Sequence, residues 1–193
     1  MSCVHINGLA PAVFLDRDGT LIEDRGHLCS PDEVAFYPVT VTALKRLQPH
    51  FKLIIVTNQP GISKGELTPA QVEAVNAHII ERLQQVGVSI ADVYCCPHQR
   101  TEGCRCIKPN RYFADLAARE HGLDLRRSFA VGDHPHDVEF GRQMGGTGIY
   151  VLTGHGEKHR TTLRGDEIVA ADIAAAADWI LRQTSQQSQG NRQ

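Results

Sequence analysis

The 193-residue sequence has no excess of positive charge and no apolar run long enough to cross a bilayer. Its formal net charge is -2, and we find no cluster of Lys and Arg of the kind that binds nucleic acid or acidic lipid. A membrane-spanning helix needs about 20 successive apolar residues, and no stretch approaches that length. We therefore expect neither nucleic acid nor a membrane as a partner.

The first residues, Met-Ser-Cys-Val-His-Ile-Asn, also lack the charged and apolar regions of a secretory signal peptide. No internal repeat is visible, and the length is typical of one domain. We expect a cytoplasmic monomer with a single domain over residues 1–182. Residues 183–193 are rich in Gln and Ser and lack apolar residues, which predicts a disordered tail.

Short apolar runs alternate with segments of helical spacing along the chain. The apolar runs predict buried strands at 12–15, 52–57, 92–95, 128–131 and 148–152. Helices are expected between Thr68 and Gly87 and over residues 39–47, 111–121, 137–144 and 172–182. The alternation predicts an α/β fold with a three-layer, Rossmann-like parallel sheet.

Three of the predicted strands end in polar residues that suit chemistry at phosphate. These are Asp16 with Asp18, Thr57 with Asn58, and Asp133 with Asp137. Because parallel strands bring their carboxyl ends to one edge of a sheet, we expect these groups to share a crevice. Carboxylates are hard oxygen ligands for Mg²⁺, and such a crevice suits phosphoryl transfer.

A second cluster, Cys96-Pro-His98 followed by Cys104-Arg-Cys106, has the ligand types of a metal site. Three thiolates and one imidazole make a closed tetrahedral Zn²⁺ site, which is structural because no coordination position stays open. The alternative is a set of ordinary reduced cysteines. Cys95 should point away from Cys96 because side chains alternate along a strand. Cys3 and Cys29 have no assigned role and are expected to be small buried residues.

Taken together, the motifs resemble the haloacid dehalogenase (HAD) superfamily of phosphatases. They are Phe-Leu-Asp-Arg-Asp-Gly-Thr, Val-Thr-Asn-Gln-Pro-Gly-Ile, Cys-Pro-His, Cys-Arg-Cys-Ile-Lys-Pro and Val-Gly-Asp, and the match covers about residues 12–153. Within this superfamily the chain is similar to the subgroup that contains D-glycero-D-manno-heptose-1,7-bisphosphate 7-phosphatase and histidinol-phosphate phosphatase. The subgroup implies a HAD-like domain with no separate cap and with a structural zinc loop, here residues 95–107.

The resemblance also implies a role for each site residue. Asp16 would be the nucleophile that forms an aspartyl phosphate, and Asp18 the general acid and then base. Mg²⁺ would be held by Asp16, Asp18 through its backbone carbonyl, and Asp133. Thr57, Asn58 and Lys108 would bind the phosphoryl group. Considered singly, Thr57 could be a strand-end hydroxyl, Lys108 a surface lysine and Asp137 only a helix cap, and we leave Asp137 outside the core set.

At two positions the sequence departs from the subgroup. Ile107 stands where relatives carry Arg, and His134 follows Asp133 where they carry Lys or Arg. A planar donor for phosphate or another anionic group is therefore missing, and the positive field is weaker or pH dependent. His155 and His159 lie in a polar loop that we expect to be solvated.

The function favoured is hydrolysis of a phosphomonoester, with a small phosphorylated molecule as partner. We expect a sugar phosphate of carbohydrate metabolism, with removal of the 7-phosphate of D-glycero-D-manno-heptose 1,7-bisphosphate. Histidinol phosphate is the alternative substrate. A phosphotransferase that passes the aspartyl phosphate to another alcohol, and a catalytically idle zinc-stabilised interaction module, are alternatives of other kinds.

Overall fold

The computed structural model describes residues 8–190 and contains a six-stranded parallel sheet in the order β3-β2-β1-β4-β5-β6. The strands are β1 (Ala12–Leu15), β2 (Lys52–Asn58), β3 (Asp92–Cys96), β4 (Phe129–Gly132), β5 (Thr147–Val151) and β6 (Ile168–Ala170). The predicted α/β class with a parallel sheet is confirmed. The strand β6 was not predicted, because it has only three residues and follows a polar, glycine-containing loop.

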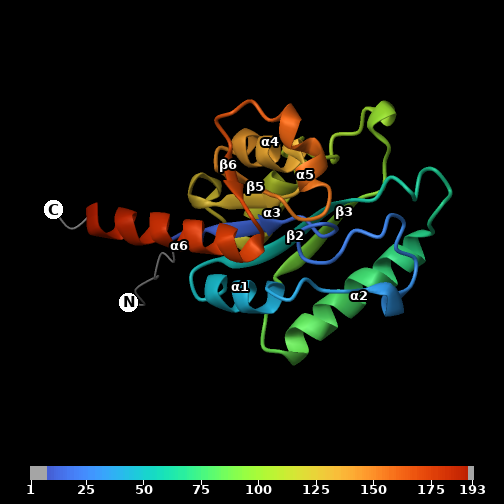
Figure 1. The fold of residues 1–193 in the computed structure, drawn as a ribbon, viewed down its shortest axis with the longest axis horizontal. Helices are drawn as coiled ribbons and strands as arrows, with labels where there is room; N and C mark the ends of the chain where they lie inside the picture. The colour runs from blue at the N-terminus through green and yellow to red at the C-terminus, as the bar shows by residue number, and fades with distance from the viewer. Residues whose placement is uncertain (1–7, 191–193) are drawn as a thin grey trace, which may run out of the picture.

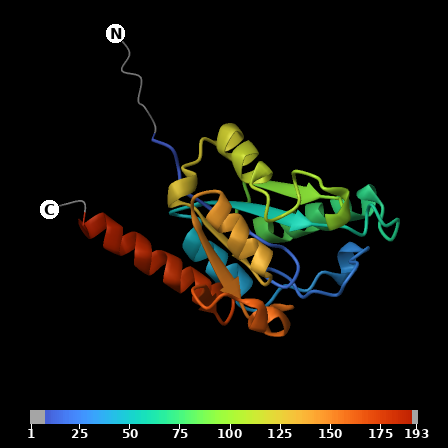
Figure 2. The same ribbon diagram turned by 90° about the horizontal axis from the view of Figure 1, so that it is seen from above.

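Helices cover both faces of the sheet, which makes three layers (Figures 1 and 2). They are α1 (Thr40–Leu47), α2 (Pro69–Gln85), α3 (Tyr112–His121), α4 (Pro135–Gln143), α5 (Gly156–His159) and α6 (Ile173–Gly190), with 3₁₀ turns at Pro31–Glu33, Arg100–Glu102, Leu125–Arg127 and Arg160–Thr162. The helices α1, α2 and α6 pack on one face, and α3 and α4 pack on the other.

The central strand β1 explains why the sheet needs cover on both sides. Val13 and Leu15 belong to one apolar cluster, while Ala12 and Phe14 belong to the other. Since alternate side chains of a strand point to opposite faces, a run with four buried residues requires an apolar layer on each side.

Local signals define most of the helix ends. Thr68 accepts a hydrogen bond from the backbone N–H of Gln71, and Pro69 occupies the first helical position of α2. Gly122, with φ of 64°, ends α3 in the left-handed conformation. The helix α4 begins two residues before the expected Asp137, because Pro135 is pre-organised for a first helical turn.

The carboxyl end of the chain corrects one expectation. Residues 183–190 continue α6 as a helix, whereas we expected a disordered tail from residue 183. Gln is a good helix former, and a helix already held by packed residues such as Ile180 extends at little cost. Residues 191–193 of the predicted tail lie outside the described residues.

No helix within residues 8–190 is long and apolar enough to span a bilayer.

Cys29 is exposed, so the expectation that it is buried was wrong, and Cys3 lies outside the described residues. Its neighbourhood explains the exposure, because Cys29 precedes the exposed 3₁₀ turn that starts at Pro31.

The strand order changes direction at β1. The chain proceeds from β1 outward through β2 to β3, then returns to pair β4 with the other edge of β1. Such a switch point leaves a crevice at the carboxyl ends of the two strands on either side of it. Asp16 follows β1 and Asp133 follows β4, so both carboxylates stand at this crevice.

Candidate active site

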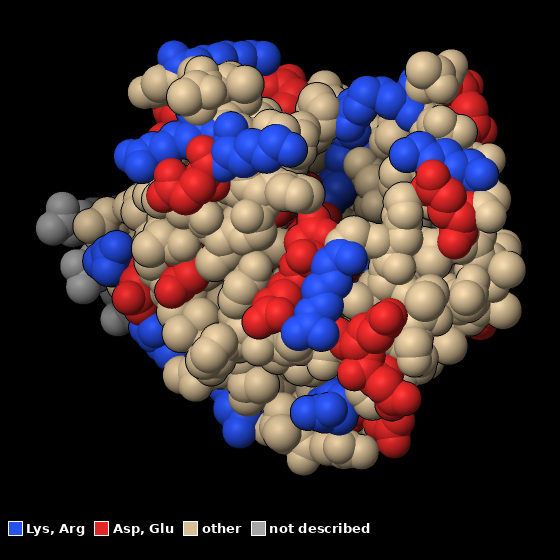
Figure 3. All heavy atoms as spheres, turned by 45° about the vertical axis from the view of Figure 1, so that its right-hand side comes forward, with Lys and Arg blue, Asp and Glu red and all other residues tan. Residues whose placement is uncertain are grey.

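One cavity of about 180 Å³ lies at the carboxyl ends of β1, β2 and β4. It is lined by all six residues to which the family resemblance assigns a role, namely Asp16, Asp18, Thr57, Asn58, Lys108 and Asp133. Asp24, Arg100, His134, His136 and Asp137 complete the lining. The face of the molecule shown in Figure 3 has a hollow at which basic and acidic side chains face one another.

Lys108 lies at the centre of the charged groups. Its Nζ is 2.5 Å from Asp16 Oδ1 and 2.6 Å from Asp137 Oδ1, and only 5% of its side chain is exposed. Burial alone would lower the pKa of Lys108, but the carboxylates of Asp137 and Asp16 raise it above its ordinary value. The lysine is therefore a permanent cation beside the carboxylate that follows β1.

Asp137 belongs to this charged group, although we left it outside the core set of predicted site residues. It is the third residue of α4, and its Oδ2 accepts a hydrogen bond from the backbone N–H of His134 at 3.1 Å. Its Oδ1 faces Lys108. The cap and the ion pair are thus made by two oxygens of one carboxylate, and the spacing from Asp133 was the only signal for it in the sequence.

The carboxylates outnumber the cations that could neutralise them. Burial, and then the neighbouring carboxylates, raise the pKa of Asp16 well above its ordinary value against the opposing effect of Lys108. Burial and Asp137 raise the pKa of Asp133 to about 7. The negative charge of these two buried carboxylates is not balanced by the nearby cations. A divalent cation that prefers oxygen ligands would balance it. The residues present therefore fit Mg²⁺.

Backbone packing holds Asp133 in place. A Cβ on Gly19 would lie 2.1 Å from Asp133 Oδ2, and a Cβ on Gly154 would lie 2.3 Å from the same atom. Both glycines also have positive φ. The backbone N–H of His155 donates to Asp133 Oδ2 at 2.7 Å. The loops after β1 and β5 therefore approach this carboxylate so closely that no side chain fits at these two positions.

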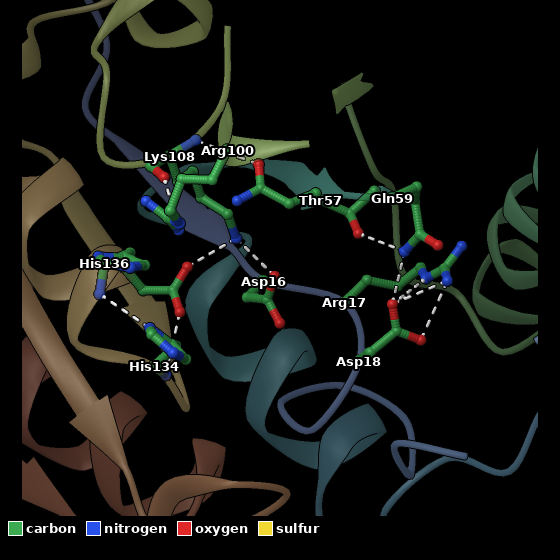
Figure 4. Close-up of polar contacts among 11 residues, drawn as sticks. Asp16, Arg17, Asp18, Thr57, Gln59, Arg100, Lys108, His134 and His136 are labelled. Atoms are coloured by element: carbon green, nitrogen blue, oxygen red, sulfur yellow. Dashed lines mark hydrogen bonds and ion pairs between the residues drawn. The ribbon is translucent and has the colours of Figure 1, made fainter. Parts of the chain in front are cut away.

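Asp18 is held on the far side of Asp16 from the histidines (Figure 4). Arg17 donates to both of its carboxyl oxygens, at 2.9 Å and 3.0 Å, and Gln59 Nε2 donates to Oδ2 at 2.7 Å. Arg17 is fully buried and also donates to Asn76 in α2. Arg17, Gln59 and Asn76 were not predicted from the sequence, because their role depends on contacts between separate elements.

Thr57 and Asn58 bring hydrogen-bonding groups from the end of β2. Gln59 Nε2 donates to Thr57 Oγ1 at 2.8 Å, which leaves the hydroxyl hydrogen of Thr57 as a donor. Asn58 Oδ1 accepts the backbone N–H of Lys108 at 3.1 Å, which leaves the Asn58 amide nitrogen as a donor. Together with Lys108 these groups could donate to the oxygens of a phosphoryl group.

The cysteine cluster has the geometry of a four-ligand site. The Sγ atoms of Cys96, Cys104 and Cys106 are 3.3 to 3.6 Å apart, and Nδ1 of His98 lies 3.4 Å from Cys106 Sγ. A tetrahedron with Zn–S bonds of about 2.3 Å has edges of about 3.8 Å, so the cluster is compatible with a zinc site. Cys95 is outside the cluster, as the alternation along β3 predicts.

The two departures from the subgroup have different structural meanings. Ile107 is buried in the apolar cluster beside Cys96, so its side chain is part of the core. His134 lies in the cavity wall, where the centroid of its ring is 4.4 Å from that of His136 and 4.6 Å from that of His159. Burial, followed by the charge of His136, lowers the pKa of His134 to about 4, so this ring is neutral near pH 7.

The loop after β5 differs from the solvated loop that we expected. Residues Gly156–His159 form α5, and His155 Nδ1 lies 3.2 Å from Asp24 Oδ2 at the cavity. His159 contacts His134 as described above. The loop therefore packs against two residues of the cavity wall, Asp24 and His134, while the His155 side chain stays half exposed.

A larger hollow of about 710 Å³ lies between α2 and β3. Its lining is mainly apolar, includes Cys95, and contains Glu73 and Asp92 but no Lys or Arg. A phosphate needs cationic or N–H donors, so this hollow does not suit a phosphorylated ligand. The smaller, charged cavity is the candidate active site.

Comparisons with known proteins agree with this geometry. Residues 105–176 match the HAD-hydrolase-like family. The chain is 33% identical over 180 residues to D-glycero-β-D-manno-heptose-1,7-bisphosphate 7-phosphatase of Yersinia pestis, and the match covers 89% of each chain. It is 32% identical over 181 residues to the protein of the same name from Escherichia coli K12, with 89% of this chain and 88% of the relative covered.

A solved structure with the same architecture is that of D,D-heptose 1,7-bisphosphate phosphatase from Bordetella bronchiseptica, complexed with magnesium and phosphate. The two structures have a TM-score of 0.81 and 32% sequence identity, with 90% of this chain and 99% of that chain covered. The structure from Burkholderia thailandensis gives a TM-score of 0.67 at 28% identity and covers 89% of this chain. The similarity thus extends over nearly the whole fold.

Proposed function

Because this chain belongs to the HAD-like phosphatases, in the group of the heptose-1,7-bisphosphate 7-phosphatases, we propose that it removes the 7-phosphate of D-glycero-D-manno-heptose 1,7-bisphosphate. The single observation that carries the proposal is the pairing of Asp16 with the buried cation Lys108 in one small cavity. The relatives named above favour the heptose substrate over histidinol phosphate.

The proposed first step is attack on phosphorus by a carboxylate oxygen of Asp16. The bond between phosphorus and the sugar oxygen breaks, and Asp18 donates a proton to that oxygen. Lys108, Thr57 and Asn58 donate hydrogen bonds to the phosphoryl oxygens as negative charge builds on them. This step leaves an aspartyl phosphate on Asp16 and releases the dephosphorylated sugar.

In the second step Asp18, now a carboxylate, accepts a proton from water as the water attacks phosphorus. The phosphorus–oxygen bond to Asp16 breaks, inorganic phosphate leaves, and both carboxyl groups return to their starting state. Asp16, Asp133 and the backbone carbonyl of Asp18 would hold Mg²⁺. When bound, Mg²⁺ would supply positive charge that neutralises part of the phosphate charge.

Arg17 and Gln59 are positioning residues for Asp18 in this proposal. Their donors hold the Asp18 carboxyl group on the side of Asp16 that lies away from the histidines. Arg17 is itself held by Asn76, which connects the general acid to α2. The zinc loop would hold Lys108, since this residue follows the last cysteine of the cluster by two positions.

The first test is release of inorganic phosphate with Mg²⁺ from heptose 1,7-bisphosphate, heptose 7-phosphate, histidinol phosphate and common sugar phosphates. We expect turnover of the bisphosphate by the wild type, and a loss of at least about a thousandfold in Asp16→Asn, which lacks the nucleophile. Equal inactivity of both proteins on every compound would contradict the proposal. Transfer of phosphate to an added alcohol, with little released phosphate, would instead favour the phosphotransferase.

A single domain, a monomeric state and a cytoplasmic location complete the proposal. The single domain is supported by one continuous sheet through the described chain. Light scattering of the purified protein tests the monomer directly, and a mass of twice 21.3 kDa would contradict it.

A further inference from the structure

The cavity around Asp16 is too small to enclose a whole bisphosphorylated sugar. Its volume is about 180 Å³, whereas pockets that enclose a ligand of drug size measure about 300 to 1,000 Å³. A phosphoryl group fits beside Lys108, and the remainder of the molecule has to lie at the mouth. The residues at the mouth therefore bear on which phosphorylated molecule is bound.

Arg100 lies at this mouth. It starts the 3₁₀ turn Arg100–Glu102 in the zinc loop, lines the cavity, and is exposed to solvent. Its Nη2 donates to the backbone carbonyl of Lys108 at 3.4 Å (Figure 4). The Arg100 guanidinium is thus held at the backbone of Lys108, whereas the Lys108 Nζ contacts Asp16.

Arg100 and Lys108 differ in what they already bind. Lys108 is paired with Asp16 and Asp137. Within residues 8–190, Arg100 makes no ion pair, and its guanidinium has further N–H donors beyond the one given to the Lys108 carbonyl. A guanidinium with such donors in a rigid fork matches the oxygens of a phosphate.

Arg100 is the residue at the mouth of the cavity that stays positively charged at neutral pH. His134 and His136 also line the cavity, and the centroids of their rings lie 4.4 Å apart. Burial, and then the charge of Arg100, lower the pKa of His136, so the guanidinium lies close enough to influence that ring. Position 107 adds no cation, because it is an isoleucine, and the Ile107 side chain is buried in the core.

We propose that Arg100 binds the phosphate that is not removed, and so makes the site selective for a sugar with two phosphate groups. This proposal rests on the proposed function, since it names how the same site recognises its substrate. The turn that carries Arg100 lies between the cluster residues His98 and Cys104. The zinc loop would therefore present both the inner cation and the outer one.

The test compares heptose 1,7-bisphosphate with heptose 7-phosphate in wild type, Arg100→Ala and Arg100→Lys. We expect Arg100→Ala to raise KM for the bisphosphate about tenfold, the effect of one charge-assisted hydrogen bond, with little change in kcat. KM for the monophosphate should change by less than about twofold, because its only phosphate lies beside Lys108. Arg100→Lys should recover part of the loss, since it keeps the charge but not the fork.

Arg127→Ala is the matched control. It removes the same charge from an exposed residue that precedes β4. This residue lies at the amino end of the strand, whereas the site lies at the carboxyl end. If Arg127→Ala raises KM as much as Arg100→Ala, the effect is long-range attraction and the proposed subsite is wrong. The subsite is also wrong if Arg100→Ala affects both substrates equally or neither.

Binding of the bisphosphate to Asp16→Asn, measured by calorimetry, separates this proposal from the proposed function. Should the wild type release no phosphate from the bisphosphate, the proposed function fails. In that case weaker binding after Arg100→Ala in the Asp16→Asn protein still supports the subsite, and unchanged or absent binding overturns it.

Discussion

Replacing Lys108 by Met is the sharpest perturbation that the site offers. The Met side chain has a similar length and no charge, so Asp16 and Asp137 would lose the ammonium that lies 2.5 Å and 2.6 Å from their oxygens. All three side chains are nearly buried, with exposed fractions of 5% for Lys108 and Asp137 and 12% for Asp16. Water therefore cannot replace the missing charge.

Removing one partner of a buried ion pair costs about 3 to 5 kcal/mol. Since Lys108 serves two carboxylates, we expect Lys108→Met to lower the free energy of unfolding by about 4 kcal/mol in magnesium-free buffer at pH 7.5. Lys64→Met, at an exposed position, is the control and should change stability by less than about 0.5 kcal/mol. Urea unfolding followed by tryptophan fluorescence measures both.

The double variant Lys108→Met with Asp137→Asn tests the cause. The amide removes one of the two orphaned charges and keeps an oxygen that can cap α4 at His134. The double variant should therefore be more stable than the sum of the two single losses predicts, by about 1 to 3 kcal/mol. Additive losses, or a Lys108→Met protein within about 1 kcal/mol of wild type, would refute the electrostatic reasoning. Phosphate release should stay lost in both variants, because the phosphoryl group still lacks Lys108.

Two further predictions concern the metal sites. Cys106→Ser should lose about one zinc per chain by elemental analysis and unfold at a clearly lower temperature, because a structural zinc site contributes directly to folding. Cys95→Ser, on the other side of β3, should keep its zinc, and retention of zinc by both would argue against the ligand set. In magnesium-free buffer, the pKa of about 7 for Asp133 exceeds the ordinary 3.8, so its contribution to stability is present below pH 3.8 and is lost as pH rises through 7. The stability of Asp133→Asn relative to wild type should thus rise by up to about 4 kcal/mol from pH 4 to pH 8, and parallel pH curves would count against it.

Much of the fold was predictable because the strands carry strong local signals. The run Ala12–Leu15 is buried on both faces, and the run from Lys52 alternates between two apolar clusters. The errors are at chain ends and in short elements. The strand β6 is too short to show a period, and the Gln-rich end of α6 has no apolar face that would predict a helix.

The site residues also fall into a predictable group and a group that could not be predicted. Residues that end strands, such as Asp16 and Asp133, could be placed from the chain order alone, since a parallel sheet brings strand ends together. Gln59 and Arg100 could not, because each acts on a group from another segment. A polar residue in a loop has the same local pattern whether it is solvated or faces a cavity. Only the packing of the loops separates these cases.

The zinc loop links a metal with no open coordination position to the chemistry of the site. Between Cys96 and Lys108 the loop has little regular structure beyond one 3₁₀ turn, and Ile107 is its buried aliphatic side chain. So few apolar contacts cannot by themselves fix the position of the Lys108 side chain. Its Nζ nevertheless has to stay within hydrogen-bonding distance of Asp16. Four ligands around one zinc ion would supply that constraint, and the four residues lie on both sides of the turn that carries Arg100. A structural metal would thus act on substrate binding through position, by keeping the inner and outer cations at a set separation.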